Sequence, residues 1–288
     1  MANMREIRTR IKSVKNTQQI TKAMKMVAVS KLRRAQAGME SMRPFADKSQ
    51  ELMNTLLGDS SGLDNEFLKP RKEIKKVCYV LFVGNRGLCG VYNSALVHYL
   101  SGIVSEQKHE TGLVVVGRWG KDVIAKSNLP VMKSFTEISD TPSAEEALSV
   151  SEYLKKLYLS GEVDEINLVY QHYVSVLRQE PSQLRLLPAE PETAQESKDG
   201  LVFEFAPDAQ SVLKAVMELY INNKVFSTLL EAKCGEHSAR MTAMTSATDS
   251  TMSLIDELGL SLNRARQAAI TTEISEIVGG ASALKRKK

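Results

Sequence analysis

The chain has 288 residues, of which 43% are hydrophobic, and it carries a net charge of +4. This length suffices for one large domain or two ordinary ones with a sizeable core. No window approaches 18 uncharged apolar residues, which excludes a membrane-spanning helix, and the N-terminus lacks the apolar segment of a secretory signal. Three cysteines, an odd number without metal-ligand spacing, predict buried free thiols in a reducing compartment, and four isolated histidines give a metal site no support.

Charge is distributed unevenly along the chain. Residues 1–43 hold eleven Lys or Arg and two Glu, a net charge of +9, and residues 260–288 carry +4. The remaining residues therefore carry −9, since the whole chain carries +4. Basic ends around an acidic middle indicate an anionic partner for the ends.

The first segment, residues 1–58, predicts a long helix. It contains no proline before Pro44, and Asn3 followed by Glu6 resembles an N-terminal cap. Heptad positions are apolar at both ends of the segment and polar between them: Ile7, Ile11, Val14, then Gln18, Thr21, Lys25, then Ala28, Leu32, Ala35, Met39, Met42. A second apolar stripe, Ile20–Met24–Val27, is expected to face another direction, and Pro44 is expected to kink the helix.

The last segment, residues 208–284, predicts a second long helix that starts at Pro207–Asp208. A seam of mainly apolar residues again follows steps of three and four: Val212, Val216, Leu219, Asn223, Phe226, Leu230. Later come Ile255, Leu258, Leu262, Ala265, Ala269, and then a separate run of Ile270, Ile274, Ile277. Gly235 and Gly259 are expected to bend this helix without ending it. From Asp208 to Val278 an unbroken helix would be about 105 Å long, and two such helices are expected to pair as a coiled coil.

Residues 73–206 alternate between strand and helix patterns. The expected strands are KKVCYVLFVG, TGLVVVGRWG, a strand–turn–strand in EINLVYQHYVSVLRQEPSQLRLLP, and a final GLVFEFAP; the expected helices are VYNSALVHYLSGIVSEQ and SAEEALSVSEYLKKLYLSG. This alternation predicts an α/β domain with a largely parallel sheet. The fold class expected overall is α/β plus long helices.

A glycine-rich turn follows the first expected strand, in LFVGNRGLCGVYN (81–93). Its Gly84, Gly87 and Gly90 have the spacing G-x-x-G-x-x-G, which matches neither a dinucleotide fingerprint nor a phosphate-binding loop. A tight strand-to-helix turn is the simpler interpretation, and nucleotide binding is the alternative. No nucleophile elbow, paired carboxylates or Ser/His/Asp pattern is evident elsewhere.

Four stretches carry a resemblance to a known family. NTQQITKAMKMVAVSKLRRAQ (16–36), RGLCGVYN (86–93), ARMTAMTSAT (239–248) and RARQAAITTEISEIVGGASAL (264–284) closely resemble the gamma subunit of bacterial F-type rotary ATP synthases. The similarity runs in order over the whole chain. It implies an antiparallel coiled coil of the N- and C-terminal helices with a central Rossmann-like α/β domain.

The resemblance also implies a function. Such a chain is the non-catalytic rotor shaft that couples ion-driven turning of a membrane ring to ATP synthesis or hydrolysis, as a peripheral protein on the cytoplasmic face of the cell inner membrane. The implied partners are three alpha and three beta subunits, the epsilon subunit and the membrane c-ring; no cofactor, metal, nucleic acid or direct small-molecule substrate is implied.

The resemblance assigns roles to a few positions. Met24 and Lys25 are expected to contact the beta subunits, and Arg266 with Gln267 to form a hydrogen-bonding catch. Arg86, Gly87 and Gly90 are expected to build the turn of the α/β domain.

The chain also departs from the family pattern. Gly84-Asn85 stands where the family usually has Ser-Asp, which is expected to weaken a local hydrogen bond to Arg86, and a basic KRKK extends the C-terminus.

Three other functions stay open at this point. A helical nucleic-acid-binding protein is suggested by the basic N-terminal arm, although its charges circle the helix and residues 1–43 contain no aromatic residue. A nucleotide-dependent enzyme on residues 73–206 is the second alternative. A generic coiled-coil scaffold is the third, and only the identity of its partner separates it from a rotor.

Overall fold

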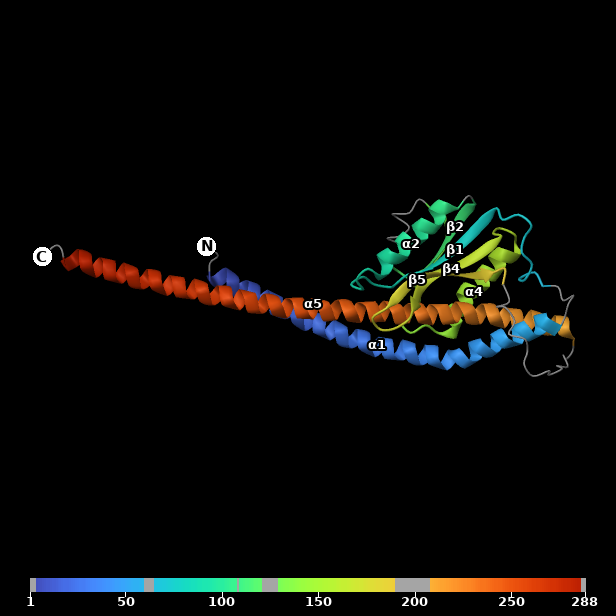
Figure 1. The fold of residues 1–288 in the computed structure, drawn as a ribbon, viewed down its shortest axis with the longest axis horizontal. Helices are drawn as coiled ribbons and strands as arrows, with labels where there is room; N and C mark the ends of the chain where they lie inside the picture. Colours follow the sequence, from blue (N-terminus) through green and yellow to red (C-terminus); the bar gives the residue numbers. More distant parts are fainter. Residues whose placement is uncertain (1–3, 60–64, 108, 121–128, 190–207, 286–288) are drawn as a thin grey trace. The chain divides into compact units, whose positions relative to one another are not determined.

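The computed structural model of the chain describes residues 4–59, 65–107, 109–120, 129–189 and 208–285. Its elements are α1 (Met4–Asp59), β1 (Lys76–Phe82), α2 (Tyr92–Glu106), β2 (Glu110–Val116), β3 (Val131–Phe135), α4 (Ala144–Leu159), β4 (Glu165–Tyr173), β5 (Gln179–Leu187) and α5 (Ala209–Lys285) (Figure 1). The chain forms two compact units. The tip unit comprises Met1–Val27 and Met241–Lys288, and the domain unit comprises Ala28–Arg240.

The domain unit contains one five-stranded sheet of order β3-β2-β1-β4-β5. Its first four strands are parallel and β5 pairs antiparallel with β4, so the expected largely parallel sheet is confirmed. Strand β3 was not predicted, because VMKSF is short and only partly buried and lacks the apolar run of the inner strands. The expected strand at GLVFEFAP lies outside the described residues.

Helices cover both faces of this sheet. Along β1, Cys78, Val80 and Phe82 point to one face and pack with buried residues of α4 and α5. The alternating residues, such as Tyr79 and Leu81, point to the other face and pack against α2. Both faces of β1 are therefore buried, which explains the continuous apolar run in its sequence.

Local sequence signals explain where two of the helices begin. Ser143 caps α4: its hydroxyl accepts a hydrogen bond from the Glu146 backbone nitrogen, and the Glu146 carboxylate accepts one from the Ser143 nitrogen. Asp208 precedes α5, and its carboxylate accepts a 2.9 Å hydrogen bond from the backbone nitrogen of Ser211. The N-terminal cap expected at Asn3 lies outside the described residues.

Helices α1 and α5 pair antiparallel in each unit. In the domain unit the Asn223 amide donates to the Ser49 hydroxyl at 2.8 Å, and in the tip unit the hydroxyls of Thr21 and Thr248 lie 2.9 Å apart. The less exposed side of α1 follows the predicted heptad through its polar positions, because Thr21 is buried and Gln18 and Lys25 are half-buried. In the second stripe, Ile20 and Val27 are 60% and 55% exposed and face away from the seam as expected, whereas Met24 is half-buried.

The proline expected to kink α1 and the glycines expected to bend α5 leave both helices continuous. Helix α1 runs unbroken through Pro44, and α5 through Gly235 and Gly259. Pro44 and Glu40 lie on the exposed side of α1, so water can hydrate the carbonyl that loses its donor at the proline. None of the described helices is both long and apolar enough to span a bilayer.

Candidate functional site: a buried charge network beside the glycine turn

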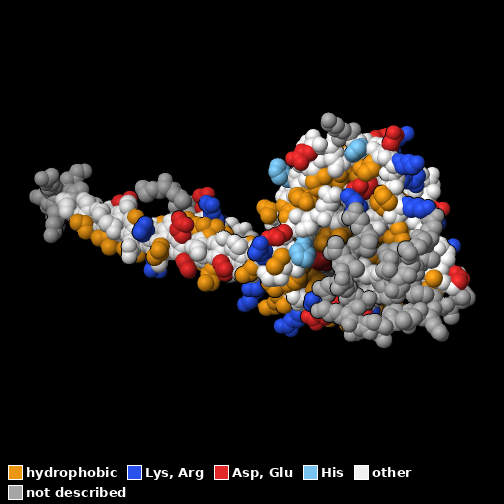
Figure 2. All heavy atoms as spheres, turned by 45° about the vertical axis from the view of Figure 1, so that its right-hand side comes forward, with side chains coloured by type: hydrophobic (Ala, Val, Ile, Leu, Met, Phe, Trp, Pro, Cys, Tyr) orange, Lys and Arg blue, Asp and Glu red, His pale blue; other side chains and the backbone are white. Residues whose placement is uncertain are grey.

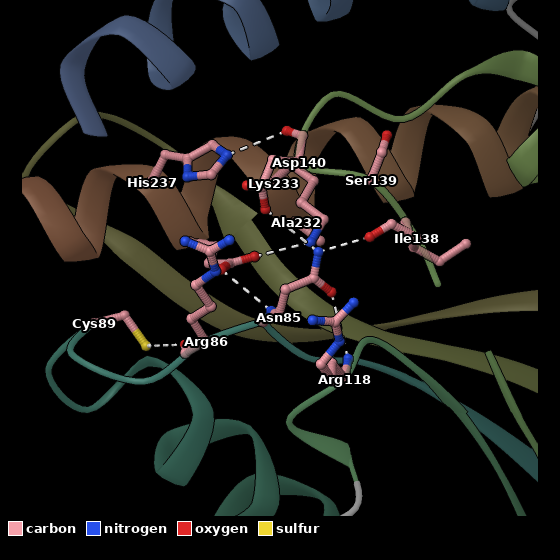
Figure 3. Close-up of polar contacts among 12 residues, drawn as sticks. Asn85, Arg86, Cys89, Arg118, Ile138, Ser139, Asp140, Ala232, Lys233 and His237 are labelled. Atoms are coloured by element: carbon pink, nitrogen blue, oxygen red, sulfur yellow. Dashed lines mark hydrogen bonds and ion pairs between the residues drawn. The ribbon is translucent and has the colours of Figure 1, made fainter. Parts of the chain in front are cut away.

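The glycine turn lies at the carboxyl end of β1 and is linked to three other segments of the domain unit. Two of these are α5 and the segment between β3 and α4, which the turn contacts directly (Figure 3). The third, α1, joins through the β3–α4 segment, because its Lys31 pairs with Asp140. Polar side chains from all four segments form what we call the junction network: Lys31, Asn85, Asp140, Lys233, Glu236, His237 and Arg240. Most of them are buried, although a helix-to-sheet contact is usually apolar.

Glu236 is the centre of the junction network. Its side chain is only 1% exposed, and its carboxylate accepts from Lys233 Nζ at 2.9 Å and from Arg240 Nη2 at 2.7 Å. Both partners lie on the same face of α5 because they are three residues before and four residues after Glu236. Burial would raise the pKa of Glu236, but the charges of Lys233 and Arg240 outweigh it and lower the pKa below its ordinary value.

The same carboxylate also occupies the glycine turn. Glu236 Oε1 accepts a 3.2 Å hydrogen bond from the Asn85 backbone nitrogen, and the Gly84 nitrogen donates to Asn93 Oδ1 at 2.9 Å. A Cβ atom at Gly84 would lie 2.9 Å from Glu236 Cδ, so glycine permits this close approach. The first two amides of the turn are thus occupied: the Gly84 amide by the Asn93 side chain and the Asn85 amide by the protein's own Glu236 carboxylate rather than by a phosphate.

Arg240 fastens the outer part of the turn to α5. Its Nη2 atom donates to the carbonyl oxygens of Arg86 and Gly87 at 3.0 and 3.4 Å. The Arg86 side chain itself is exposed, and the turn reverses through left-handed backbone at Leu88 and Gly90, with φ of 59° and 58°. The structure therefore assigns Arg86 and Gly87 a role through their carbonyls, and Gly90 a role through its conformation.

Asn85 and Asp140 join the segment before α4 to the network. The Asn85 amide donates to the Ile138 carbonyl at 2.6 Å and to Asp140 Oδ1 at 3.3 Å, and its own carbonyl accepts from the Arg118 nitrogen. We expected Asn85 to weaken a bond to Arg86, but Asn85 has no hydrogen bond to that residue in the described structure and bridges these other groups instead.

Lys31 of α1 completes the network by pairing with Asp140. The ion pair links the helix to the segment before α4. Burial would raise the pKa of Asp140, but the hydrogen bond and charge of Lys31 prevail and lower it to about 2. Asp140 is therefore ionised at neutral pH, and the segment is held to α1 by charge as well as by packing.

The tip unit holds the other predicted site residues in two separate places. Met24 and Lys25 are half-buried on α1, close to the Thr21–Thr248 contact. Arg266 and Gln267 are exposed on α5, beyond Ala265, the last described side chain of α5 that is half-buried. Arg266 lies eighteen residues past Thr248, about 27 Å along the helix, so the two predicted contacts are not brought together.

Sequence reasoning missed the charged residues of α5 that build the junction network. The signal was present as four ionic or imidazole side chains among the eight residues from Lys233 to Arg240, in the part of α5 that the structure buries on all sides. The pattern was overlooked because its partners lie more than ninety residues away in sequence, on a turn and a loop. The three cysteines are buried and free, as expected.

The fold and the site together define a class of protein: an α/β domain fastened by buried charges to a long antiparallel helix pair. The comparisons identify the family. The ATP synthase family profile matches residues 3–284. The ATP synthase gamma chains of Desulfitobacterium hafniense and Staphylococcus aureus (strain bovine RF122 / ET3-1) are 44% and 40% identical over 99% of this chain and 100% of each relative.

Solved structures agree at the level of the fold. A chain in the Euglena gracilis mitochondrial ATP synthase (OSCP/F1/c-ring) matches with a TM-score of 0.70 and 20% identity, covering 98% of this chain and 94% of that one. A chain in the central stalk and c-ring structure from Tetrahymena thermophila matches with a TM-score of 0.58 and 22% identity, covering 79% and 99%. The chain belongs to the ATP synthase gamma chain family.

Proposed function

We propose that this chain is the central rotor shaft of an F-type ATP synthase, itself non-catalytic. It couples ion-driven rotation of a membrane ring to ATP synthesis or hydrolysis at catalytic sites on other subunits. Its membership of the gamma chain family supports this function, as does one feature of the tip unit, the C-terminal part of α5.

The observation that carries the proposal is the exposed C-terminal part of α5, which we call its bare end. Every described side chain from Arg266 to Ser282 is exposed, although the stretch contains an apolar face. That face consists of Ile270, Ile274, Ile277 and Val278, which are 48%, 56%, 67% and 58% exposed. A single helix with a continuous apolar face needs a partner to cover it. A surrounding sleeve of other subunits would do so, and a helix inside a sleeve is free to turn.

The proposed partners follow from the family. Three alpha and three beta subunits form the sleeve, and the epsilon subunit and the membrane c-ring bind the other end. The structural relatives were solved as parts of F1, rotor and c-ring assemblies. The chain is accordingly a peripheral protein at the cytoplasmic face of the cell inner membrane, and it needs no cofactor, nucleic acid or small-molecule substrate of its own.

We assign the working parts of the shaft as follows. Residues 1–58 and 208–284 are the two helices of the coiled coil, and residues 73–206 are the α/β domain. Met24 and Lys25 contact the beta subunits during rotation. Arg266 and Gln267 form a catch at the end of the shaft, where the planar guanidinium of Arg266 suits a carboxylate partner.

Reconstitution tests the proposal. The purified chain is mixed with separately purified alpha and beta subunits of the same source, and assembly and ATP hydrolysis are measured. We expect hydrolysis to rise steeply only when the chain is present, and to fall when residues 264–288 are removed. A chain that neither joins the assembly nor changes turnover would contradict the proposal.

A further inference from the structure

His237 is the one member of the junction network whose ordinary pKa lies near neutrality. Its side chain is buried on α5 between two fixed partners. The ring nitrogen Nδ1 lies 3.4 Å from Arg240 Nη1. The other ring nitrogen, Nε2, lies 3.2 Å from the carbonyl oxygen of Asp140, a contact that can be followed in Figure 3. These contacts tie α5 to the segment before α4.

The two partners determine the protonation state of the ring. A guanidinium only donates hydrogen bonds and a carbonyl oxygen only accepts them. Nδ1 must therefore accept from Arg240, and Nε2 must carry the proton that is donated to the Asp140 carbonyl. Only the neutral imidazole with its hydrogen on Nε2 satisfies both contacts.

A second proton would oppose one of these contacts directly. Protonated Nδ1 would point an N–H group at the Arg240 guanidinium, donor against donor. Charged groups from every element packed here surround the ring and its partners: Lys31 from α1, Lys233, Glu236 and Arg240 from α5, and Asp140 from the β3–α4 segment. Three cations already face two carboxylates, so an imidazolium would add a fourth cation.

We propose that His237, Arg240 and the Asp140 carbonyl form a pH-sensitive latch, in which protonation of the imidazole releases the glycine turn and the β3–α4 segment from α5. Arg240 connects the two loops, since the guanidinium that donates to His237 also donates to the carbonyls of Arg86 and Gly87. Displacing it from the ring disturbs both attachments at once. The latch is a property of this chain alone and does not depend on the rotor function.

The direction of the pH effect follows from the ring's surroundings. Burial lowers the pKa of His237 below its ordinary value of 6.5, and the neighbouring Arg240 and Lys233 add to this against Glu236 and the Asp140 carbonyl. A depressed histidine pKa means that the unfolded or opened chain binds the proton more tightly. The latch is therefore closed above the ordinary pKa and opens as the pH falls.

Hydrogen–deuterium exchange of the full-length chain tests the latch. Peptides covering residues 84–90 and 136–141 should lose about tenfold in protection between about pH 8 and about pH 5.5, after correction for intrinsic rates. Peptides from β1 and β2 should not. His237→Gln stays neutral and should keep the protection at both values, whereas the control His172→Gln, which removes an exposed imidazole paired with Glu231, should respond like the unaltered chain.

Two results would overturn the latch: an unaltered chain equally protected at both pH values, or a His237→Gln chain that loses protection just as the unaltered chain does. If His237→Gln does not fold, the imidazole titration of the unaltered chain is followed by NMR. The latch then requires the chemical shifts of the Gly87 and Asp140 amides to change with pH at the same midpoint as the His237 ring. Amide shifts that do not follow the titration of the ring would refute it.

Discussion

Replacing Glu236 by glutamine tests the junction network at its centre. The substitution keeps the shape of the side chain and removes the negative charge that Lys233 and Arg240 share at 2.9 and 2.7 Å. Removing one partner of a buried ion pair costs about 3–5 kcal/mol, because the remaining charge is left uncompensated away from water. Here two cations lose their common partner in a site that is almost fully buried, so we expect a cost in the upper part of that range.

The chain offers both a reporter and a matched control for this experiment. Its single tryptophan, Trp119, donates its backbone N–H to the Gly84 carbonyl at 3.0 Å, so its fluorescence reports unfolding beside the network. The control is Glu180→Gln, which breaks an exposed pair with Arg178 and should cost less than about 1 kcal/mol. Urea unfolding should place the Glu236→Gln midpoint about 1–2 M lower. A midpoint within error of the control would refute the reasoning.

Three further results are expected. Gly84→Ala should destabilise the chain by about 1–3 kcal/mol in urea unfolding, because the added Cβ would lie 2.9 Å from Glu236. The control is Gly87→Ala, which should be near neutral because an added Cβ there has no atom within 4 Å. Equal effects of the two substitutions would argue against the close approach at Gly84. The pKa of Asp140 is lowered to about 2, so its ionised form stabilises the fold above the ordinary pKa of 3.8, and this contribution is lost as the pH falls towards 2. Asp140→Asn should therefore flatten that part of the acid unfolding curve. An unchanged curve would contradict the ion pair with α1. Arg266→Ala combined with Gln267→Leu should lower ATP turnover of the assembled complex while leaving the melting temperature of the free chain unchanged, because both side chains are exposed; unchanged turnover would reject the catch.

Periodicity carried most of the fold prediction. Apolar residues spaced three and four apart predicted α1 and α5, and continuous apolar runs predicted β1, β2 and β4. Burial of one side of a helix, or of both faces of a strand, requires apolar residues at those positions in the sequence. The seam could even be followed through Thr21, whose polar side chain finds a hydroxyl partner on the opposite helix. Strand β3 was missed because a short, half-exposed edge strand imposes no such pattern.

The junction network was beyond the reach of the sequence for a different reason. Glu236 meets Asn85 across 151 residues, and Lys31 meets Asp140 across 109. Nothing in local spacing connects such residues. The glycine turn could therefore be considered as a phosphate-binding site, but not recognised as the place where a carboxylate of the same chain binds. What the sequence did contain was an unusual density of charge inside a buried stretch of helix, and such density is a reason to look for distant partners.

Direct observation of rotation tests the central claim. The three native cysteines are buried, so Ser101→Cys, on the exposed side of α2, provides a single accessible attachment point for a marker on the α/β domain. The chain is assembled with alpha and beta subunits fixed to a surface, ATP is added, and the marker is followed. The rotor function predicts sustained turning in one direction that stops without ATP. A marker that stays still while the same assemblies hydrolyse ATP would show that the chain is not the shaft.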